Sequence, residues 1–584
     1  MKRNIIILLL LSLIVVACKK SDFLEDKTNA LTEEAVFTDS IQSINFLNRI
    51  YVDAGFSFGP SRFSAAGGTG NTEAATDNAE GINNLSVFSD AYVQGIISPS
   101  NVTTGFGADK DFWNGPYKNI RRVNLMLSKL PQIPFAEETK KRIRGELHFL
   151  RVWYYHYMLV AFGGVPLIED KVYGINDIID LPRSSYADCV TYLVGELNGA
   201  AAELNGVIYK DADYGRVTHG ACLALKSRIL LYAASPLFNG GALTSDPGLA
   251  SLVSYPTADK NRWQLAADAA EAVINLNRYS LNVDNATRAG YGFYAVFLKR
   301  VNSEYIFAYN RAAQKEFEAY FLPPSRSGAA TMKPTQSLAA AFPMKDGKPS
   351  TESPLYSAAN PYLNRDPRFD NSFIYNGLSY MSNNGTKTQV LTYSSVGSSI
   401  ANTTADVYTG TNKSTGYYSR KMLDENLTNA TSGNTERAWP LIRYAEILLN
   451  YAEAINEAGE PAKAYPKLVE LRSRAGILPG TDNLYGLKAN MNADEMREVI
   501  RNERRIEMAF EDQRWNDIRR WKIAATVLKG FNTVQLVTRT GTSTYNYAVA
   551  NAVRPLNFRD AMYLLPLPLS EIQKMPKMRQ NPGY

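Results

Sequence analysis

The sequence predicts a mainly α-helical protein in which pairs of helices form a scaffold and long irregular segments form a second, loop-rich portion. Apolar residues recur at helical spacing in segments that come in widely separated pairs. Between residues 277 and 436, in contrast, Gly, Ser, Thr, Asn and Tyr are abundant and no period is sustained. A chain of 584 residues is long enough for one large domain or two smaller ones.

Residues 1–17 have the features of a lipoprotein signal peptide. Lys2 and Arg3 precede an apolar run, residues 5–16, that is too short to span a bilayer. The run ends in Val-Val-Ala-Cys at residues 15–18, the order of a bacterial lipobox. We therefore expect cleavage before Cys18 and acylation of its thiol, and acyl chains would hold the mature chain on a membrane. The alternative is an ordinary secretory signal followed by an incidental cysteine.

Residues 18–276 are predicted to form an N-terminal helical region. It begins with a polar tether and an extended arm, residues 19–34. A stretch rich in Gly, Ser and Asn, residues 55–107, separates the first two helices. The helices are expected in three pairs, at 41–52 and 111–130, at 137–162 and 186–204, and at 217–234 and 261–276.

Residues 277–584 are predicted to form a C-terminal region with two parts. The loop-rich insertion, 277–436, contains one clear strand at 304–309 and several shorter ones. The second part, 437–584, holds repeat helices and a tail. Its helices are expected at 439–458, 461–475 and 493–510, and its tail ends in a short strand at 561–565.

The helix that ends near Ala458 has the spacing of a tetratricopeptide repeat. Ala445 and Ala452 would let a neighbouring helix approach closely. Gly459 ends the helix, and Pro461 suits the first turn of the next one. Pro466 should cost that next helix one hydrogen bond. The large apolar residues that share one face are Tyr444, Ile447, Leu448, Tyr451 and Ile455.

Charge and motifs exclude several classes of function. The formal net charge is only +6, because basic and acidic residues nearly balance, and no helix carries a basic stripe. Both observations argue against a nucleic-acid partner. No nucleophile elbow, Walker A loop or calcium loop is present, so no cofactor is predicted. His219 and Cys222 have a spacing seen in metal sites, but no second ligand pair accompanies them, so no metal site is predicted. Cys189 and Cys222 could pair in an oxidising compartment or stay as small buried residues.

A carboxylate series on one helical face is the strongest enzyme-like feature. Glu503, Glu507 and Glu511 could in principle supply an acid and a base for glycoside hydrolysis. Many arginines crowd the same segment, and neighbouring cations lower carboxyl pKa values, whereas a general acid needs a raised pKa. We therefore interpret the segment as a structural ion-pair network, with Trp515 and Trp521 packing it onto the repeat helices.

Several motifs, in order along nearly the whole mature chain, resemble those of the SusD/RagB family. They are Arg144–Arg151 with Tyr154–Val160 and Phe162–Ile168; Gly215–Thr218 with Ala221, Ala224, Leu225 and Arg228; Asp366–Arg368; Arg443–Glu453, Arg472–Gly476, Glu503–Glu507 and Arg514–Asp517; and Leu565–Pro568, Glu571 and Gln580–Tyr584.

The resemblance implies a scaffold of tetratricopeptide-like helix pairs with a loop-rich ligand-binding portion. It also implies a non-catalytic protein at the bacterial surface that binds an oligosaccharide or another nutrient. Its partner would be a SusC-like TonB-dependent transporter in the outer membrane. The matching motifs belong to the scaffold, so they assign no ligand-binding residue.

The ligand contacts must therefore be predicted from chemistry. Aromatic faces stack on sugar rings, and amide and guanidinium groups bind the hydroxyls. Tyrosine, which is both apolar and polar, is abundant, with 35 residues against 24 Phe. The predicted contacts are Tyr309, Arg311, Tyr320 and Phe321 in the insertion, with Phe88 and Tyr92 in the first irregular stretch.

A surface-anchored glycoside hydrolase is the alternative function. Carboxylates in the irregular region, such as Glu318 or Asp366, would then perform the chemistry. Nothing in the sequence selects a pair of them.

Overall fold

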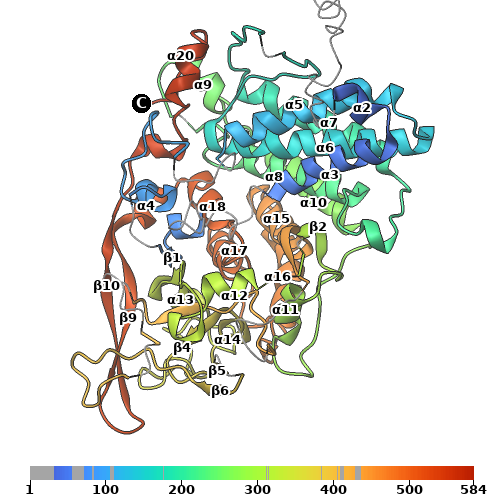
Figure 1. Cartoon of the computed structure of the whole chain (residues 1–584). Coiled ribbons are helices and arrows are strands. Elements are labelled where there is room, and N and C mark those ends of the chain that lie inside the picture. The colour runs from blue at the N-terminus through green and yellow to red at the C-terminus, as the bar shows by residue number, and fades with distance from the viewer. Residues whose placement is uncertain are drawn as a thin grey trace, which may run out of the picture.

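The computed structural model describes residues 32–55, 72–81, 85–104, 111–174, 176–241, 243–310, 312–313, 315–382, 385–403, 406–407, 414–427 and 436–584. Helices dominate this part of the chain, and its strands pair only two by two (Figure 1). The predicted mainly α-helical fold class is confirmed. The predicted division between residues 276 and 277 stays a prediction.

The N-terminal helices lie side by side as one layer, shown in blue to green in Figure 1. Side-chain caps fix where several begin: Asp39 accepts from two backbone N–H groups at the start of α3, Ser185 caps α7 and Thr218 caps α8. The layer comprises α2 (Glu33–Phe37), α3 (Ser40–Ala54), α5 (Asn114–Lys129), α6 (Glu137–Phe162), α7 (Tyr186–Leu204), α8 (His219–Ala234) and α10 (Asn261–Ile274).

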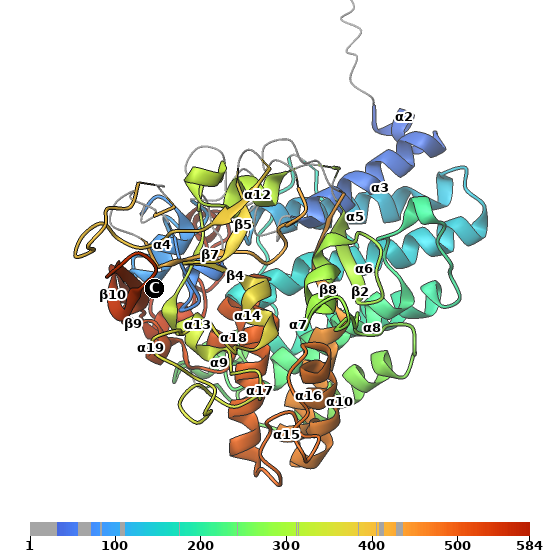
Figure 2. The same cartoon turned by 90° about the horizontal axis from the view of Figure 1, so that it is seen from below.

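The C-terminal helices continue this packing. Helix α15 (Tyr444–Glu457) packs against α10 of the first layer and against α16 (Tyr465–Arg474) and α17 (Ala493–Glu507). Every residue of the apolar face predicted for α15 is buried. Viewed from below, α15, α16 and α17 form one group beside the N-terminal helices (Figure 2). Helix α18 (Arg514–Arg520) follows α17 after a short turn.

Pro466 does not interrupt a helix. The segment predicted as one helix is a 3-10 turn, Pro461–Ala464, followed by α16, which begins at Tyr465. Pro466 therefore occupies the first turn of α16, where its missing N–H has no intrahelical partner to lose. The expected cost of one hydrogen bond is wrong for this reason.

Strand β2 (Tyr305–Asn310) confirms the predicted strand with a shift of one residue, and it pairs antiparallel with β8 (Ala438–Arg443). Residues 439–443 were expected in a helix. They are a strand because their backbone pairs with β2, and α15 begins only at Tyr444.

Three short antiparallel pairs and several short helices complete the loop-rich portion. The strand pairs are β1 (Ala79–Glu80) with β3 (Lys333–Pro334), β4 (Phe373–Tyr375) with β7 (Tyr417–Ser419), and β5 (Ser379–Met381) with β6 (Lys387–Gln389). Besides α2, the short α-helices among the described residues are α4 (Phe88–Val93), α9 (Pro247–Val253), α11 (Tyr291–Ala295), α12 (Glu316–Phe321), α13 (Gln336–Ala341), α14 (Pro367–Ser372), α19 (Ala524–Val527) and α20 (Leu569–Lys574).

A long hairpin, which the sequence analysis did not predict, forms one side of the molecule. Its strands are β9 (Lys529–Arg539) and β10 (Tyr545–Asn557), paired antiparallel. The hairpin lies at the outer margin in both views, far from α6 and α7 (Figures 1 and 2).

The C-terminal tail closes the end of α6. The last carbonyls of a helix have no partner within it, and here distant residues supply the donors. Arg519 donates to the carbonyl oxygen of Val160 (2.8 Å), the backbone N–H of Leu565 to that of Ala161 (2.7 Å), and the Asn581 amide to that of Phe162 (2.9 Å). The strand predicted at 561–565 is therefore wrong: residues 560–563 form a 3-10 turn, and Leu565 bonds to a helix end.

A buried ionic network joins the C-terminal helices to the strands and the insertion. Glu507 of α17 accepts hydrogen bonds from Arg443 (2.8 Å), Arg368 (3.0 Å) and Arg474. Glu511 accepts from Arg443 (2.7 Å) and from Lys421 of the insertion (2.6 Å). The structural interpretation of the Glu503–Glu511 series is confirmed.

Candidate functional site

Two adjoining cavities open where α3, β2 and the turn before α8 meet. The first, of about 250 Å3, is bordered by Tyr51, Tyr309 and Asn310. The second, of about 320 Å3, is bordered by Tyr209, Tyr279 and Asn302. The two share Tyr214, Gly215, Arg216 and Ala308 as lining residues, so they lie next to each other, and together they are called the recess below.

Two glycines allow the recess to form. A Cβ atom on Gly55 would lie 2.4 Å from Cζ of Tyr309, so only glycine lets that ring pack against the end of α3. Gly215 has φ +99°, and a Cβ there would lie 2.1 Å from Nδ2 of Asn310. The Asn310 amide instead donates to the carbonyl oxygen of Tyr214 (2.7 Å), which fixes the end of β2 on the turn.

The buried carboxylate of Glu146 on α6 orients the polar groups of the recess. It accepts from the hydroxyls of Tyr51 (2.6 Å) and Tyr209 (3.2 Å) and from the Arg216 guanidinium (3.1 Å). Burial, together with the negative charge of Glu146, raises the pKa of Tyr51 well above its usual value. The tyrosine hydroxyls therefore stay protonated and act as hydrogen-bond donors.

The chemistry of the recess suits recognition better than catalysis. Arg216 lies 5.4 Å from the centre of the Tyr51 ring, and its guanidinium also donates to Asp213 (2.7 Å) and to the Asn48 amide oxygen (2.9 Å). Among the described residues that line the two cavities, Asp213 is the one carboxylate, and it is paired with Arg216. Aromatic faces stack on sugar rings, and amide and guanidinium donors bind the sugar hydroxyls.

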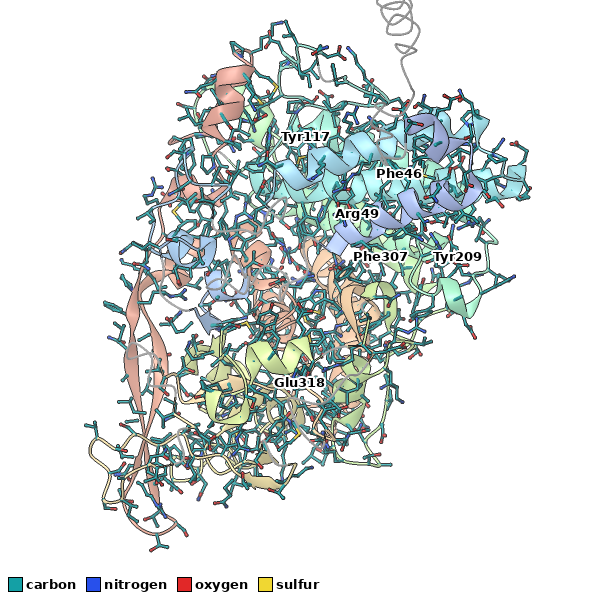
Figure 3. All side chains as sticks on the ribbon, in the orientation of Figure 1. Phe46, Arg49, Tyr117, Tyr209, Phe307 and Glu318 are labelled. Atoms are coloured by element: carbon teal, nitrogen blue, oxygen red, sulfur yellow. The ribbon has the colours of Figure 1, made fainter. Side chains whose placement is uncertain are left out.

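A larger cavity, of about 520 Å3, lies between α5, residues 166–179 and α20. Its lining is mainly aliphatic and aromatic. The Tyr117 hydroxyl already donates to the Pro166 carbonyl oxygen (2.9 Å) and Arg121 to that of Tyr173 (2.9 Å). The exposed lining of this cavity is mostly apolar, whereas that of the recess is more evenly divided between polar and apolar groups, so the recess suits a sugar better. Figure 3 shows Tyr117 well apart from Tyr209 and Phe307, which border the recess.

Two family descriptions match the chain. The description "SusD family" matches residues 293–584, and "Starch-binding associating with outer membrane" matches residues 22–231. This chain belongs to the SusD family. The resemblance inferred from the sequence motifs is thereby confirmed.

Relatives and solved structures that are similar to this chain are also named as SusD-like proteins. SusD-like protein P38 of Formosa agariphila is 23% identical over 452 residues, which cover 74% of this chain and 76% of the relative. A SusD-like protein of Bacteroides fragilis has a similar crystal structure, with a TM-score of 0.74 at 25% identity over 95% of this chain and 100% of the other. A SusD-like carbohydrate binding protein of the same organism shares the fold, with a TM-score of 0.69 at 23% identity over 93% of this chain and 100% of the other.

The predicted contact residues of this SusD-family chain differ in where the structure places them. Tyr309 lines the recess, and Tyr320 is half-buried on α12. Phe321 is buried beside Phe317, which stacks on Trp439 at 6.1 Å, so the Phe321 ring has no exposed face and its role as a contact stays a prediction. Arg311 and Cys18 lie outside the described residues.

Phe88 and Tyr92 are core residues of α4. Their relative exposures are 1% and 0%, and both rings lie edge-on to Trp515 of α18, at 5.9 and 5.6 Å. The Tyr92 hydroxyl donates to the Met562 carbonyl oxygen (3.0 Å). Neither ring has an exposed face in this structure, so their assignment as contacts stays a prediction that the burial of both rings does not favour.

The residues of the recess that sequence reasoning missed are Tyr51, Tyr209, Tyr214 and Arg216. Arg216 was noted only as part of the Gly215–Thr218 motif. The turn at 210–216, rich in Asp, Tyr and Gly, was the available signal for an exposed loop before α8.

The carboxylates of the hydrolase alternative are held in ion pairs. Glu318 pairs with Arg437, and Asp366 caps α14 and pairs with Arg368 (2.7 Å). Figure 3 places Glu318 on α12, away from the recess. These pairs weaken the case for the hydrolase.

Neither metal nor disulfide chemistry is evident in the part of the chain that the structure describes. It contains no cluster of three or more His, Cys, Asp or Glu side chains that could hold a metal ion. His219 bonds to the Ala201 carbonyl oxygen (2.8 Å), and Cys189 and Cys222 are buried free thiols. No helix among the described residues is both long and apolar enough to cross a membrane.

Proposed function

We propose that this protein binds an oligosaccharide at the cell surface and passes it to a SusC-like TonB-dependent transporter, without cleaving it. Membership of the SusD family carries the proposal. The description of the matched N-terminal part as starch-binding and associated with the outer membrane supports both the ligand class and the location. The lipobox at residues 15–18 supports anchoring through an acylated Cys18.

The recess is the proposed ligand site. Tyr309 and Tyr214 would stack on sugar rings, while Asn310 and Arg216 would bind hydroxyls. Tyr320 on α12 stays a proposed contact. Phe88, Tyr92 and Phe321 are left out because they are buried.

Binding and cleavage can be separated in one experiment. Soluble starch and a panel of other polysaccharides would be cast in native gels, and retardation of the protein would report binding. The same mixtures would be assayed for new reducing ends. We expect retardation by at least one polysaccharide and no release of reducing ends, and release would favour the hydrolase.

The site is tested with Tyr309→Ala. Loss of a stacking ring should weaken binding by about 1 kcal/mol or more. Tyr291→Ala, which removes a tyrosine of α11 outside the recess, is the matched control. If Tyr309→Ala and Tyr320→Ala both bind like the unaltered protein, the site lies elsewhere even if the protein binds glycan.

A further inference from the structure

The hairpin β9–β10 has one edge covered by the loop-rich portion. On β9, the Gln535 N–H donates to the Thr415 carbonyl oxygen (3.0 Å). The carbonyl oxygens of Val537 and Arg539 accept from Ser394 (2.9 Å) and Ser399 (2.8 Å). The backbone groups of Gln535, Val537 and Arg539 therefore face away from β10.

The register of the hairpin then decides which groups of β10 face outward. Gln535 lies opposite Val549, Val537 opposite Tyr547, and Arg539 opposite Tyr545. In an antiparallel pair, residues that do not bond to each other direct their backbone groups to the two outer edges. The N–H and C=O groups of Tyr545, Tyr547 and Val549 consequently point to the free edge of β10, and alternation adds Asn551.

No hydrogen bond from the described residues reaches these outward groups. Figures 1 and 2 both place the hairpin at the outer margin of the molecule. The free edge thus has unpaired donors and acceptors in alternation, between the turn at 540–544 and the bulge that begins after Asn551.

The side chains of this edge lack the usual protection against strand pairing. Exposed edges normally carry lysines, prolines or inward-facing charges. Residues 545–553 contain no charged residue and no proline, and Val549 and Val553 are 61% and 52% exposed. Pro555 comes only after the bulge.

We propose that the free edge of β10 pairs with the same edge of a second copy of this chain. The pairing is antiparallel about a two-fold axis at Ala548 and yields a four-stranded sheet across two molecules. Tyr547 of one copy then lies opposite Val549 of the other, and Tyr545 lies opposite Asn551. Every outward backbone group of residues 545–551 finds a partner in this register.

The properties of the β10 edge favour a second copy of this chain as its partner. A two-fold interface needs a surface that is complementary to itself, and an edge of alternating donors and acceptors has this property. Like charges directly opposite each other destabilise a strand pair, and residues 545–553 have no charges to oppose. The inference does not depend on the proposed glycan binding.

Cross-linking of Ala548→Cys in the full chain, expressed in its own membrane, tests the register. Ala548 would face its counterpart in a pair without mutual hydrogen bonds, where Cβ atoms lie about 4.5–5.5 Å apart. This separation is close to the range of a disulfide, about 3.5–4.5 Å. Mild oxidation should give a species of twice the chain mass.

Leu536→Cys is the matched control. Leu536 is directly opposite Ala548 on β9 and shares its face, but it lies one strand farther from the edge. The native Cys189 and Cys222 are buried and should stay unreactive. We expect cross-linking at residue 548 and none at residue 536. A residue-548 thiol that labels readily with maleimide but never cross-links overturns the proposal, and so does a product with a different protein.

Charge reversal gives an independent test. Ala548→Lys or Ala548→Glu would place like charges face to face at the axis, whereas a mixture of the two variants would place opposite charges there. With two affinity tags, co-purification should fall at least tenfold within each variant and recover in the mixture. Unchanged co-purification of Ala548→Lys with itself, at an unchanged melting temperature, would refute the pairing.

Discussion

Two glycines determine the geometry of the proposed site. Gly55 and Gly215 leave the space into which Tyr309 and Asn310 fit, and each added Cβ would collide with one of these side chains. The geometry of the recess therefore depends on residues that offer no side chain to a sugar. Their effect on the ligand would be indirect, through the position of the ring and the amide.

Gly55→Ala tests this dependence. The new methyl would lie 2.4 Å from Tyr309 Cζ, so the ring must shift from its position in the recess. We expect glycan binding to weaken by about 1 kcal/mol or more, measured by native affinity electrophoresis. Gly195→Ala on α7 is the control, because a Cβ there meets nothing within 4 Å. If both variants bind the glycan equally well, Tyr309 does not contact the ligand.

Glu73 is a buried acid that should give the protein a pH-dependent stability. Burial is the main cause that raises its pKa to about 7, the Asn78 hydrogen bond opposes this rise, and the charge of Asp512 adds to it. The folded protein thus keeps this proton at pH values where the unfolded chain, with a pKa near 4.5, has released it. The stabilisation is complete below pH 4.5 and is lost as the pH rises through 7.

Glu73→Gln should remove this dependence. The shift corresponds to about 3 kcal/mol, so the variant should gain stability relative to the unaltered protein between pH 5 and 8. Urea unfolding at several pH values measures the difference. Glu33→Gln, at an exposed position, is the control. Parallel pH curves for Glu73→Gln and the unaltered protein would contradict the raised pKa.

At the scale of elements, α17 is held to its neighbours by charges as well as by apolar contacts. Glu507 connects it to β8 through Arg443, to α16 through Arg474 and to α14 through Arg368. These cations outweigh the effect of burial and hold the pKa of Glu507 well below its usual range. Such a carboxylate is unsuited to act as a general acid.

Glu507→Gln should therefore destabilise the fold and leave glycan affinity unchanged. Removal of one partner from a buried network costs about 3–5 kcal/mol. Chemical denaturation measures the loss, and affinity electrophoresis of the folded fraction measures binding. Glu498→Gln is the control on the same helix, because its side chain is 74% exposed. Lost affinity at unchanged stability would instead place Glu507 in the ligand site.

The sequence predicted the long helices well because each has its own apolar period and often its own cap. It did not predict β9–β10, since periodicity cannot reveal which strands pair. It also placed residues 439–443 in a helix, because their partner β2 lies more than a hundred residues earlier in the chain. Local signals specify local elements, and long-range pairing overrides them.

At the scale of the whole molecule, the site depended on contacts that no local pattern encodes. Phe88 and Tyr92 had the composition of a ligand platform, yet Trp515 covers them from the other end of the chain. Tyr309 could be selected from its chemistry. Its neighbours Tyr214 and Arg216 could not, because the hydrogen bond from Asn310 to Tyr214 brings two distant segments together.

At the scale of the whole molecule, we also expect the location of the protein at the outer membrane to depend on Cys18. We expect Cys18→Ser to remain unprocessed or to leave the outer-membrane fraction, because the variant lacks the thiol proposed to accept the lipid. Fractionation and fatty-acid labelling report the result, and Cys189→Ser, which alters a buried thiol, is the control. A Cys18→Ser protein that still labels and fractionates with the outer membrane would refute the anchor.

The closure of α6 by the C-terminal tail has a consequence for biosynthesis. The donors for the carbonyls of Val160 and Ala161 come from Arg519 and Leu565, and the Phe162 carbonyl accepts from both Arg183 and Asn581. Arg519, Leu565 and Asn581 are synthesised late. While the chain is emerging from the ribosome, the end of α6 therefore lacks part of its hydrogen bonds. A transcript that ends before the codon for Leu565 should yield a product in which the Ala161 carbonyl has lost this donor, and quality-control proteases should degrade that product faster than the full chain.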